Sequence, residues 1–297
     1  MKRNVVLTII LFLSVIGVRA QLNCTFTHYT QENGLSQNTI MDMIQDSDGL
    51  IWFATWNGIN RFDGYEFRIY KAHKDNDSQW SSNRVDKLDM DSHGNVWCLS
   101  YDGRAFRFDK RQEAFHEIKP KGDIDFFADR IYTLNNSSVW LLSPETGAVR
   151  GTGDCVTFEN YGKVNRVFLD SRQHEWVLTD DGLRCIDAKT NKQSTYFATN
   201  KKTKAVDKQN FLSAVEADGK IYFGSDKGRI WVNDIKTGEF TMHTIDANDE
   251  VFYMESLKNG KLLIVTRQNG IAITDKKLEK TEWLLTAKSF DLTANQF

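Results

Sequence analysis

The chain has 297 residues, and its 38 basic and 40 acidic residues give a formal net charge of −2. Because so balanced a charge provides no domain-wide basic field, it argues against a nucleic acid as a partner of this chain. An aromatic content of 12% and only two prolines indicate a sizeable core and no proline-rich linker between domains.

The first twenty residues have the pattern of a signal peptide. Lys2 and Arg3 form a short positive region, and an almost uninterrupted apolar stretch follows over residues 5–18. Val18-Arg19-Ala20 approximates the small-x-small pattern of a signal peptidase site. A membrane-spanning helix needs about 20 apolar residues, and this run is shorter. We therefore expect export, with residues 1–20 removed and no membrane span after cleavage; a retained N-terminal anchor is the alternative.

A short pattern recurs along the mature region, residues 21–297. Each copy has an apolar or aromatic residue at its second position, closes on Ser or Thr, and reaches a glycine three or four residues later. The closing positions recur every 36 to 46 residues, which is the spacing of a propeller blade. The six copies are residues 51–55, 96–100, 139–143, 175–179, 221–225 and 262–266.

The first repeat divides into four strands separated by turns. Asp46-Ser47-Asp48-Gly49 and Trp56-Asn57-Gly58 are turn sequences, because Asp and Ser bond their own backbone and Gly accepts a positive φ. No sustained 3.6-residue apolar period follows the N-terminal stretch. Four antiparallel strands per unit of about 42 residues predict an all-β fold, a β-propeller of six repeats plus an incomplete seventh. The expected strands of the first repeat are residues 38–44, 51–55, 59–62 and 65–70.

The register of the repeats also predicts the blades and the ends of the array. Residues 26–29 resemble an outer strand that lacks the rest of its blade, and residues 294–297 resemble the start of a further blade. Propellers commonly close by lending an N-terminal strand to the last blade, so we interpret the chain as a truncated piece of a longer protein. The six blades are expected at about residues 38–70, 83–118, 128–160, 164–197, 211–245 and 250–285.

Several phrases of the first repeat are distinctive: His28-Tyr29-Thr30, the run from Asn33 to Asn38, the run from Asp46 to Thr55, and the run from Gly58 to Tyr65. In these phrases the chain resembles the N-terminal two-component-regulator propeller repeats of the periplasmic sensor region of Bacteroidetes hybrid two-component system histidine kinases. The third repeat departs from the pattern, since Asn135-Asn136-Ser137-Ser138 lacks the turn glycine before its strand.

The resemblance implies a periplasmic region that senses an oligosaccharide for a parent protein anchored in the inner membrane. In that family a second propeller follows, and the parent has a homodimer partner, a histidine kinase and a DNA-binding domain. This chain contains no kinase histidine box, no glycine-rich ATP lid and no receiver aspartate pocket. The signalling output is therefore implied for the parent alone.

Patterns of catalytic or metal-binding residues are absent from the sequence. There is no GxSxG, no HExxH and no CxxC pair. The aspartates of 46–49 could suggest calcium, but the further oxygen donors and the distal Glu of such a loop are missing. We therefore expect no enzymatic activity, no catalytic residue, no metal and no cofactor.

The four cysteines are Cys24, Cys98, Cys155 and Cys185. Cys98 and Cys185 fall inside strand-like runs, where a buried thiol is the expected state. Export permits a disulfide, but the sequence does not indicate which pair would form it.

The tryptophans fall into two groups. Those at the second position of the strand cores recur once per blade (Trp52, Trp97, Trp140 and Trp176), which predicts packing between blades. Trp56 and Trp80 instead fall in a turn and in a connection between blades, two loop classes that share one face of a propeller. Exposed aromatic rings there suit stacking on sugars, and ordinary loop residues or contacts to a neighbouring domain are the alternative. The candidate ligand-binding residues are Trp56, Asn57, Trp80, Tyr101, Asp102 and Asp181.

Three functions remain open at this stage. The first is the ligand-sensing propeller. The second is a carbohydrate-active propeller enzyme, a hydrolase or lyase, which would need converging carboxylates. The third is a scaffold or a non-functional fragment.

Overall fold

The computed structural model describes residues 27–71, 82–122, 124–145, 147–153, 155–187, 189–197 and 209–286. These residues form six four-stranded antiparallel sheets, each made of four strands that are consecutive in the chain. Blade 1 consists of β1 (Ile40–Gln45), β2 (Ile51–Thr55), β3 (Gly58–Phe62) and β4 (Phe67–Tyr70).

Blades 2 to 6 repeat this order. Blade 2 is β5 (Val85–Met90), β6 (Val96–Ser100), β7 (Ala105–Asp109) and β8 (Ala114–Glu117), and blade 3 is β9 (Arg130–Thr133), β10 (Ser138–Ser143), β11 (Gly147–Thr152) and β12 (Cys155–Glu159). Blade 4 is β13 (Val164–Leu169), β14 (His174–Thr179), β15 (Gly182–Asp187) and β16 (Gln193–Tyr196), and blade 5 is β17 (Phe211–Ala217), β18 (Lys220–Ser225), β19 (Arg229–Asp234) and β20 (Phe240–Thr244). Blade 6 is β21 (Val251–Ser256), β22 (Leu262–Thr266), β23 (Gly270–Thr274) and β24 (Thr281–Thr286).

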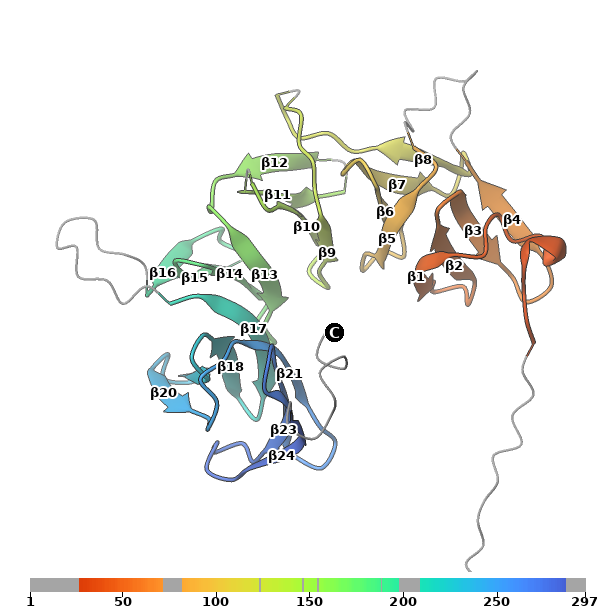
Figure 1. Ribbon diagram of the computed structural model, residues 1–297. Helices are drawn as coiled ribbons and strands as arrows, with labels where there is room; N and C mark the ends of the chain where they lie inside the picture. The colour runs from red at the N-terminus through yellow and green to blue at the C-terminus, as the bar shows by residue number, and fades with distance from the viewer. Residues whose placement is uncertain are drawn as a thin grey trace, which may run out of the picture.

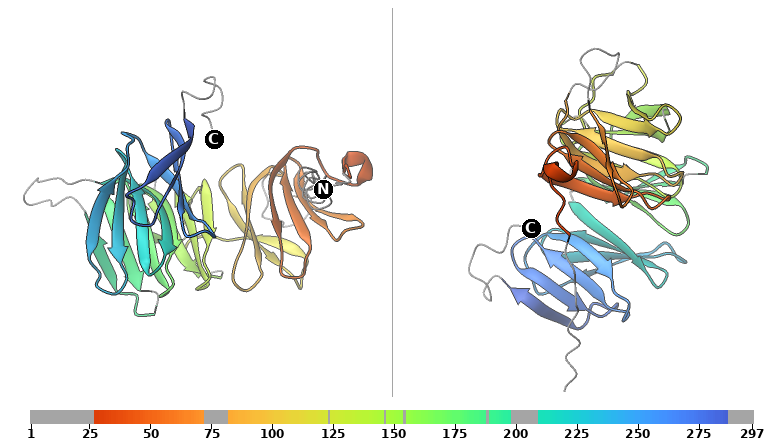
Figure 2. Two further views of the ribbon diagram at one scale, coloured as in Figure 1. Left: turned by 90° about the horizontal axis from the view of Figure 1, so that it is seen from below. Right: turned by 90° about the vertical axis from the view of Figure 1, so that its right-hand side faces the viewer.

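The sheets stand side by side around a common centre, with the first strand of each blade innermost, and form an open arc in which blade 1 and blade 6 lie at the two ends (Figure 1). Neighbouring blades contact each other largely through these first strands, as β1 does with β5 and β17 does with β21. The views in Figure 2 show the same stack of sheets edge-on. The predicted all-β propeller fold is confirmed. The incomplete seventh repeat, at residues 294–297, lies outside the described residues.

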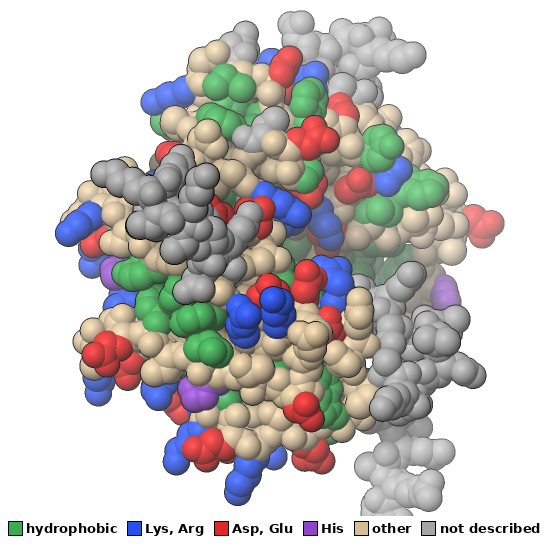
Figure 3. Space-filling model, turned by 60° about the vertical axis from the view of Figure 1, so that its left-hand side comes forward, with side chains coloured by type: hydrophobic (Ala, Val, Ile, Leu, Met, Phe, Trp, Pro, Cys, Tyr) green, Lys and Arg blue, Asp and Glu red, His purple; other side chains and the backbone are tan. Residues whose placement is uncertain are grey.

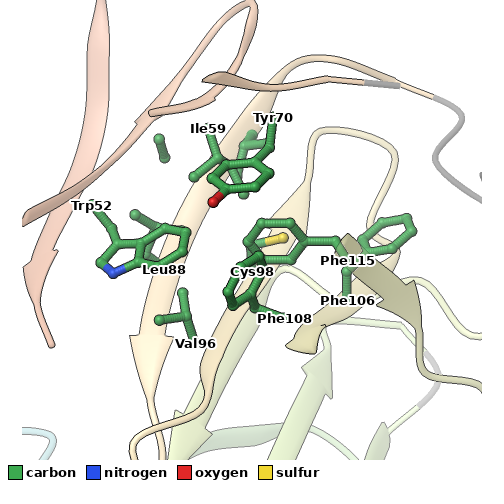
Figure 4. Close-up of a cluster of buried hydrophobic side chains, with 11 residues drawn as sticks. Trp52, Ile59, Tyr70, Leu88, Val96, Cys98, Phe106, Phe108 and Phe115 are labelled. Carbon is green, nitrogen blue, oxygen red and sulfur yellow. The ribbon is translucent and has the colours of Figure 1, made fainter. Parts of the chain in front are cut away.

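The hydrophobic core lies between the blades. Between blades 1 and 2, the ring of Trp52 meets those of Phe108 and Tyr70, with centroids 4.9 and 5.7 Å apart. Figure 4 shows these rings directed toward one another around Cys98 and Phe115. The four recurring tryptophans are at most 2% exposed. Their predicted role in packing between blades is confirmed, because burying large rings from both sheets at this position removes much apolar surface from water.

The aspartate of each Asp-rich turn binds its own turn and the tryptophan that follows. In blade 1, Asp46 accepts hydrogen bonds from the backbone N–H of Asp48 and Leu50, at 3.0 and 2.9 Å, and from the indole Nε1 of Trp52 at 2.7 Å. Asp91 and Asp170 accept the same bonds in blades 2 and 4. The predicted turn role of these residues is confirmed. Among the described residues no group of three or more His, Cys, Asp or Glu side chains could hold a metal ion.

The segment before blade 1 differs from the expectation. Residues 27–29 form no strand, because no neighbouring strand pairs with them, and the chain instead makes one turn of 3₁₀ helix, η1 (Gln31–Asn33). The ring of Tyr29 packs edge-on against those of Phe62 and Phe67. The segment thus covers part of the outward face of blade 1. Phe26 and the predicted signal peptide lie outside the described residues.

Cysteine burial agrees with the sequence. Cys98 and Cys185 are buried and Cys155 is exposed, and all three are free thiols; Cys24 lies outside the described residues. Burial raises the pKa of the Cys98 thiol, and it raises that of Cys185 to about 12. A thiol with so high a pKa is a poor nucleophile. None of the helices in the described part of the chain is long and apolar enough to cross a membrane.

Candidate loop-face ligand site

One end of the blades carries both loop classes that the sequence singled out. In blades 1 and 2, a backbone hydrogen bond joins the turn between the second and third strands to the connection that leads to the next blade: Gly58 N donates to Asn83 O at 2.6 Å, and Ala128 N donates to Gly103 O at 2.8 Å. Gly58 is required there, since its φ is +110° and a Cβ would lie 2.5 Å from Tyr70 O. We call this end of blades 1 to 3 the loop face; it consists of residues 56–58, 82–86, 101–104, 117–122 and 124–128.

Two exposed aromatic side chains and an arginine meet on the loop face. The guanidinium carbon of Arg84 lies 4.1 Å from the ring centroid of Tyr101 and 5.3 Å from that of Trp56. The side chain of Trp56 belongs to blade 1, while Arg84 and Tyr101 belong to blade 2. The exposed fraction is 50% for Trp56 and 63% for Tyr101, so both rings remain accessible while the guanidinium holds their positions.

Neighbouring groups fix the three side chains. The indole Nε1 of Trp56 donates to Met41 Sδ at 2.9 Å, and Arg84 Nε donates to Asp86 Oδ1 at 2.9 Å. The backbone N–H of Tyr101 donates to Arg84 O at 2.9 Å, which couples the turn to the start of the innermost strand. The cluster is therefore built before any ligand arrives.

A second group of charged residues lies beside Tyr101. Ser100 Oγ donates to Asp102 Oδ1 at 2.5 Å, and Arg104 Nε is 3.7 Å from Asp102 Oδ2. Arg104 also reaches Glu117 at 3.2 Å, and Lys119 lies 3.8 Å from the same carboxylate. Every cation of this group is thus paired with a carboxylate.

The apolar surface continues from Tyr101 toward blade 3. Phe127 is 53% exposed and Ile124 is 43% exposed, and Phe127 lies against Gly103, the glycine of the Tyr101 turn. The cavity beneath them, about 20 Å³, is bordered by Phe126 and Leu141. A volume of that size has room for one water molecule. A larger ligand would therefore lie on the loop face, across the rings.

Only some of the predicted ligand-binding residues lie close together in the structure. Trp56 and Tyr101 lie together, and Asp102 follows in the Tyr101 turn. Asn57 is nearby, but its Nδ2 donates to Ser36 O at 3.4 Å and so helps to anchor the N-terminal segment. Asp181 lies in the turn between β14 and β15 of blade 4, on another part of the arc (Figure 1). Trp80 lies outside the described residues.

Arg84 is a residue that sequence reasoning missed. Arg84 directly precedes the first strand of blade 2, and this position lies on the same face as the turns between second and third strands. The spacing of the repeats could therefore have indicated that Arg84 belongs to this face. Its approach to Trp56, however, depends on how closely two blades stack.

The corresponding turns of blades 4 to 6 contain no aromatic residue. They carry Asp180-Asp181, Asp226-Lys227 and Arg267-Gln268-Asn269. The side of the molecule on which blades 4 and 5 lie shows acidic and basic side chains interspersed, with small hydrophobic groups between them (Figure 3). The combination of exposed rings and a stacked guanidinium is confined to blades 1 and 2 within the described residues.

Of two further grooves, the first borders the loop face at residues 117–119 and the second lies away from it. One of about 370 Å³ runs along β7 and β8 beside Arg107 and His116, and one of about 220 Å³ lies between blades 4 and 5 beside Arg172 and His174. The tryptophan behind the second groove, Trp176, is 2% exposed. Neither groove offers the accessible rings of the loop face.

Comparison with known protein families finds a match for the first repeat. Residues 34–57 match the family described as "Two component regulator propeller". The first repeat of this chain is thus similar to the regulator propeller repeat. The matched span includes Trp56 and Asn57, and it agrees with the resemblance inferred from the sequence.

A curated relative and several solved structures extend this result. Histidine kinase P4 of Formosa agariphila is 42% identical over 72 residues, which are 23% of this chain and 5% of that protein. The extracellular domain of the hybrid two component system BT3049 of B. thetaiotaomicron has a TM-score of 0.56 and 20% identity, over 86% of this chain and 36% of that one. That of BT4673 has a TM-score of 0.55 and 19% identity, over 84% and 37%. A streptogramin B lyase structure shares the fold at a TM-score of 0.53 and 17% identity, over 85% of both chains.

The chain therefore spans a small part of its curated relative and little more than a third of the two sensor structures. At identities of 20% or below, the structural likeness shows the fold. The sequence match connects the chain to the propeller region of sensor histidine kinase-like proteins.

Proposed function

We propose that this regulator propeller is the periplasmic, non-enzymatic sensing region of a longer two-component regulator, and that it binds a glycan on the loop face. The observation that carries the proposal is the cluster of Trp56, Arg84 and Tyr101, which presents two accessible rings held by one guanidinium. Rings of this kind supply the apolar faces on which sugar rings stack, and the neighbouring polar groups supply orientation.

The family match supports a sensory role, because it covers the repeat that contributes Trp56. The solved relatives are extracellular domains of sensor systems, which supports a location outside the cytoplasm. The predicted signal peptide at residues 1–20 is consistent with that location. In this proposal the propeller signals that a glycan is bound through its contacts with other parts of the regulator.

The test is binding of oligosaccharides to the purified chain, screened on an oligosaccharide array and measured by calorimetry. We expect Trp56→Ala to weaken binding at least tenfold, because one stacking face is removed. Met242→Ala is the matched control, since Met242 is also 50% exposed but lies on β20 of blade 5. Equal affinity of the two variants would rule out the loop face.

Chromatography of the same mixtures distinguishes sensing from catalysis. We expect each oligosaccharide to be recovered intact after prolonged incubation. Cleavage products that persist through purification would overturn the non-enzymatic role and favour a propeller hydrolase or lyase.

A further inference from the structure

We infer that the loop face selects uncharged sugars: its ligand is a neutral, pyranose-based oligosaccharide rather than one that carries carboxylates or sulfates. The inference rests on the proposed glycan-binding function and specifies the class of glycan. It follows from the charge balance of the side chains around the exposed rings and from the hydrogen-bonding groups that they leave for a ligand.

The charged side chains that contact one another beside the two rings form balanced ion pairs. Arg84 pairs with Asp86, Arg104 pairs with Asp102 and Glu117, and Lys119 lies beside Glu117. These contacts involve three cations and three carboxylates. Because Arg84, Arg104 and Lys119 each already have a carboxylate within 4 Å, an anionic ligand that bound one of them would have to displace that carboxylate or lie close to it, and like charges at that distance repel.

The Arg84–Asp86 pair nevertheless suits hydroxyl groups. Asp86 accepts a hydrogen bond from Nε of Arg84. Within the described residues, Asp86 is the side chain that hydrogen-bonds to the Arg84 guanidinium. The two η nitrogens of Arg84 can donate, and Asp86 can accept through its remaining lone pairs. Each sugar hydroxyl both donates and accepts, so adjacent hydroxyls of one ring satisfy such a pair without any net charge.

Aromatic surface supplies the remaining contacts. Tyr101 and Trp56 are both accessible and both contact the guanidinium, and Phe127 continues the surface beyond Gly103. The apolar C–H faces of pyranose rings match such surfaces, while a carboxylate or sulfate in their place would lose hydration, and the nearby cations Arg84, Arg104 and Lys119 are already paired with carboxylates. The row of three rings across blades 1 to 3 favours an oligosaccharide over a monosaccharide.

The experiment measures matched pairs of tetrasaccharides that differ only at C6. Calorimetry with the purified chain would compare β-1,4-mannotetraose with β-1,4-tetramannuronate, α-1,4-galactotetraose with α-1,4-tetragalacturonate, and cellotetraose with its tetraglucuronate counterpart. In every pair that shows binding, we expect the neutral member to bind at least fivefold tighter. Its affinity should change less than twofold between 50 and 500 mM NaCl, because no counterion is exchanged.

A variant that breaks the charge balance sharpens the test. Asp86→Asn leaves the Arg84 cation without its carboxylate, so we expect weaker binding of the neutral member and a gain of at least threefold for the acidic one. Glu282→Gln is the control, because it makes the same change of charge on an exposed residue of β24 in blade 6. It should change neither affinity.

The outcomes separate the two proposals. Tighter binding of the acidic member overturns the neutral-sugar inference and leaves glycan sensing in place, whereas binding of no member of any pair overturns both. If Asp86→Asn weakens both members equally, the Arg84–Asp86 pair does not set the selectivity and the inference fails.

Discussion

Blades 2 and 3 have the same strand order, but the indole N–H groups of their buried tryptophans donate hydrogen bonds to different kinds of acceptor. In blade 2 the indole N–H of Trp97 donates to Asp91, six residues earlier in the same turn, at 2.9 Å. In blade 3 no aspartate occupies that turn, and the indole N–H of Trp140 donates to Glu175 of blade 4 at 2.8 Å. A buried N–H needs an acceptor, but the acceptor need not come from its own repeat.

Glu175 does more than replace the missing aspartate. Its fully buried carboxylate also accepts from Ser138 Oγ at 2.5 Å and from Arg150 Nε and Nη2 at 2.8 and 3.0 Å. Burial raises its pKa, but the hydrogen bonds from Arg150 and Ser138 outweigh that effect, and the pKa is lowered overall. One side chain thus joins blades 3 and 4, whereas Asp91 serves its own blade.

The largest expected effect is that of Glu175→Ala. We expect a loss of about 3–5 kcal/mol in the free energy of unfolding, because Arg150 would be left as an unpaired, largely buried cation. Urea unfolding followed by circular dichroism measures it. Arg150→Met in the same chain should recover part of the loss, since the unpaired charge is then absent. Glu145→Ala, at an exposed position of blade 3, is the control, and a loss no larger than its own would contradict the assigned role.

Asp91→Ala should have a smaller effect, about 2 kcal/mol. It removes the acceptor of Trp97 and of two backbone N–H groups, those of His93 and Asn95, but leaves no charge unpaired. The same unfolding measurement applies. Asp46→Ala should have a slightly smaller effect, because Asp46 accepts the equivalent backbone and indole bonds in blade 1 but lacks the bonds that Asp91 accepts from Asn95 Nδ2. A difference of more than about 1 kcal/mol would break the equivalence of the two turns.

Acid should destabilise the protein through these carboxylates. Burial raises the pKa of Asp91, but hydrogen bonds from Trp97 and Asn95 outweigh it and lower the pKa overall. The folded-state pKa therefore lies below the unfolded value of about 3.9, so the stabilisation is complete above that pH and disappears as the pH falls through the folded-state pKa. Unfolding measured between pH 6 and pH 2 should show a shallower decline in Asp91→Ala than in the parent chain. Parallel curves for the two proteins would show that Asp91 does not contribute to acid sensitivity.

The smallest expected effect on stability is that of Tyr101→Ala on the loop face. Tyr101 is largely exposed, and its contact with Arg84 should contribute about 0.5–1 kcal/mol at most. A loss above about 2 kcal/mol in urea unfolding would show that the ring supports the fold rather than a ligand site. Oligosaccharide affinity, by contrast, should fall in this variant as it does in Trp56→Ala.

Much of the fold could be predicted because each blade is a local unit. Its strands are consecutive, its turns carry Asp, Asn or Gly, and its tryptophan recurs at one position. Residues 27–29, expected to belong to an outer strand, pack as an irregular segment against Phe62 and Phe67, and their pairing within a further blade stays a prediction. An apolar alternation predicts a strand only where another strand is available to pair with it.

The candidate site was predicted in part. Trp56 and Tyr101 could be assigned to one face from the repeat register alone. Arg84 was missed, and Asp181 was grouped with residues of distant blades. The spacing of the repeats predicts on which face of the propeller a residue lies, but it does not predict which residues of other blades lie next to it.

The sequence by itself determined the repeat, the six sheets, the buried tryptophans and the turn aspartates, since all of these depend on residues within about ten positions of one another. The tertiary structure alone decided that Glu175 accepts the indole N–H of Trp140 and that Arg84 contacts both Trp56 and Tyr101. These contacts join separate blades, and their geometry is set by how closely the sheets pack rather than by spacing along the chain.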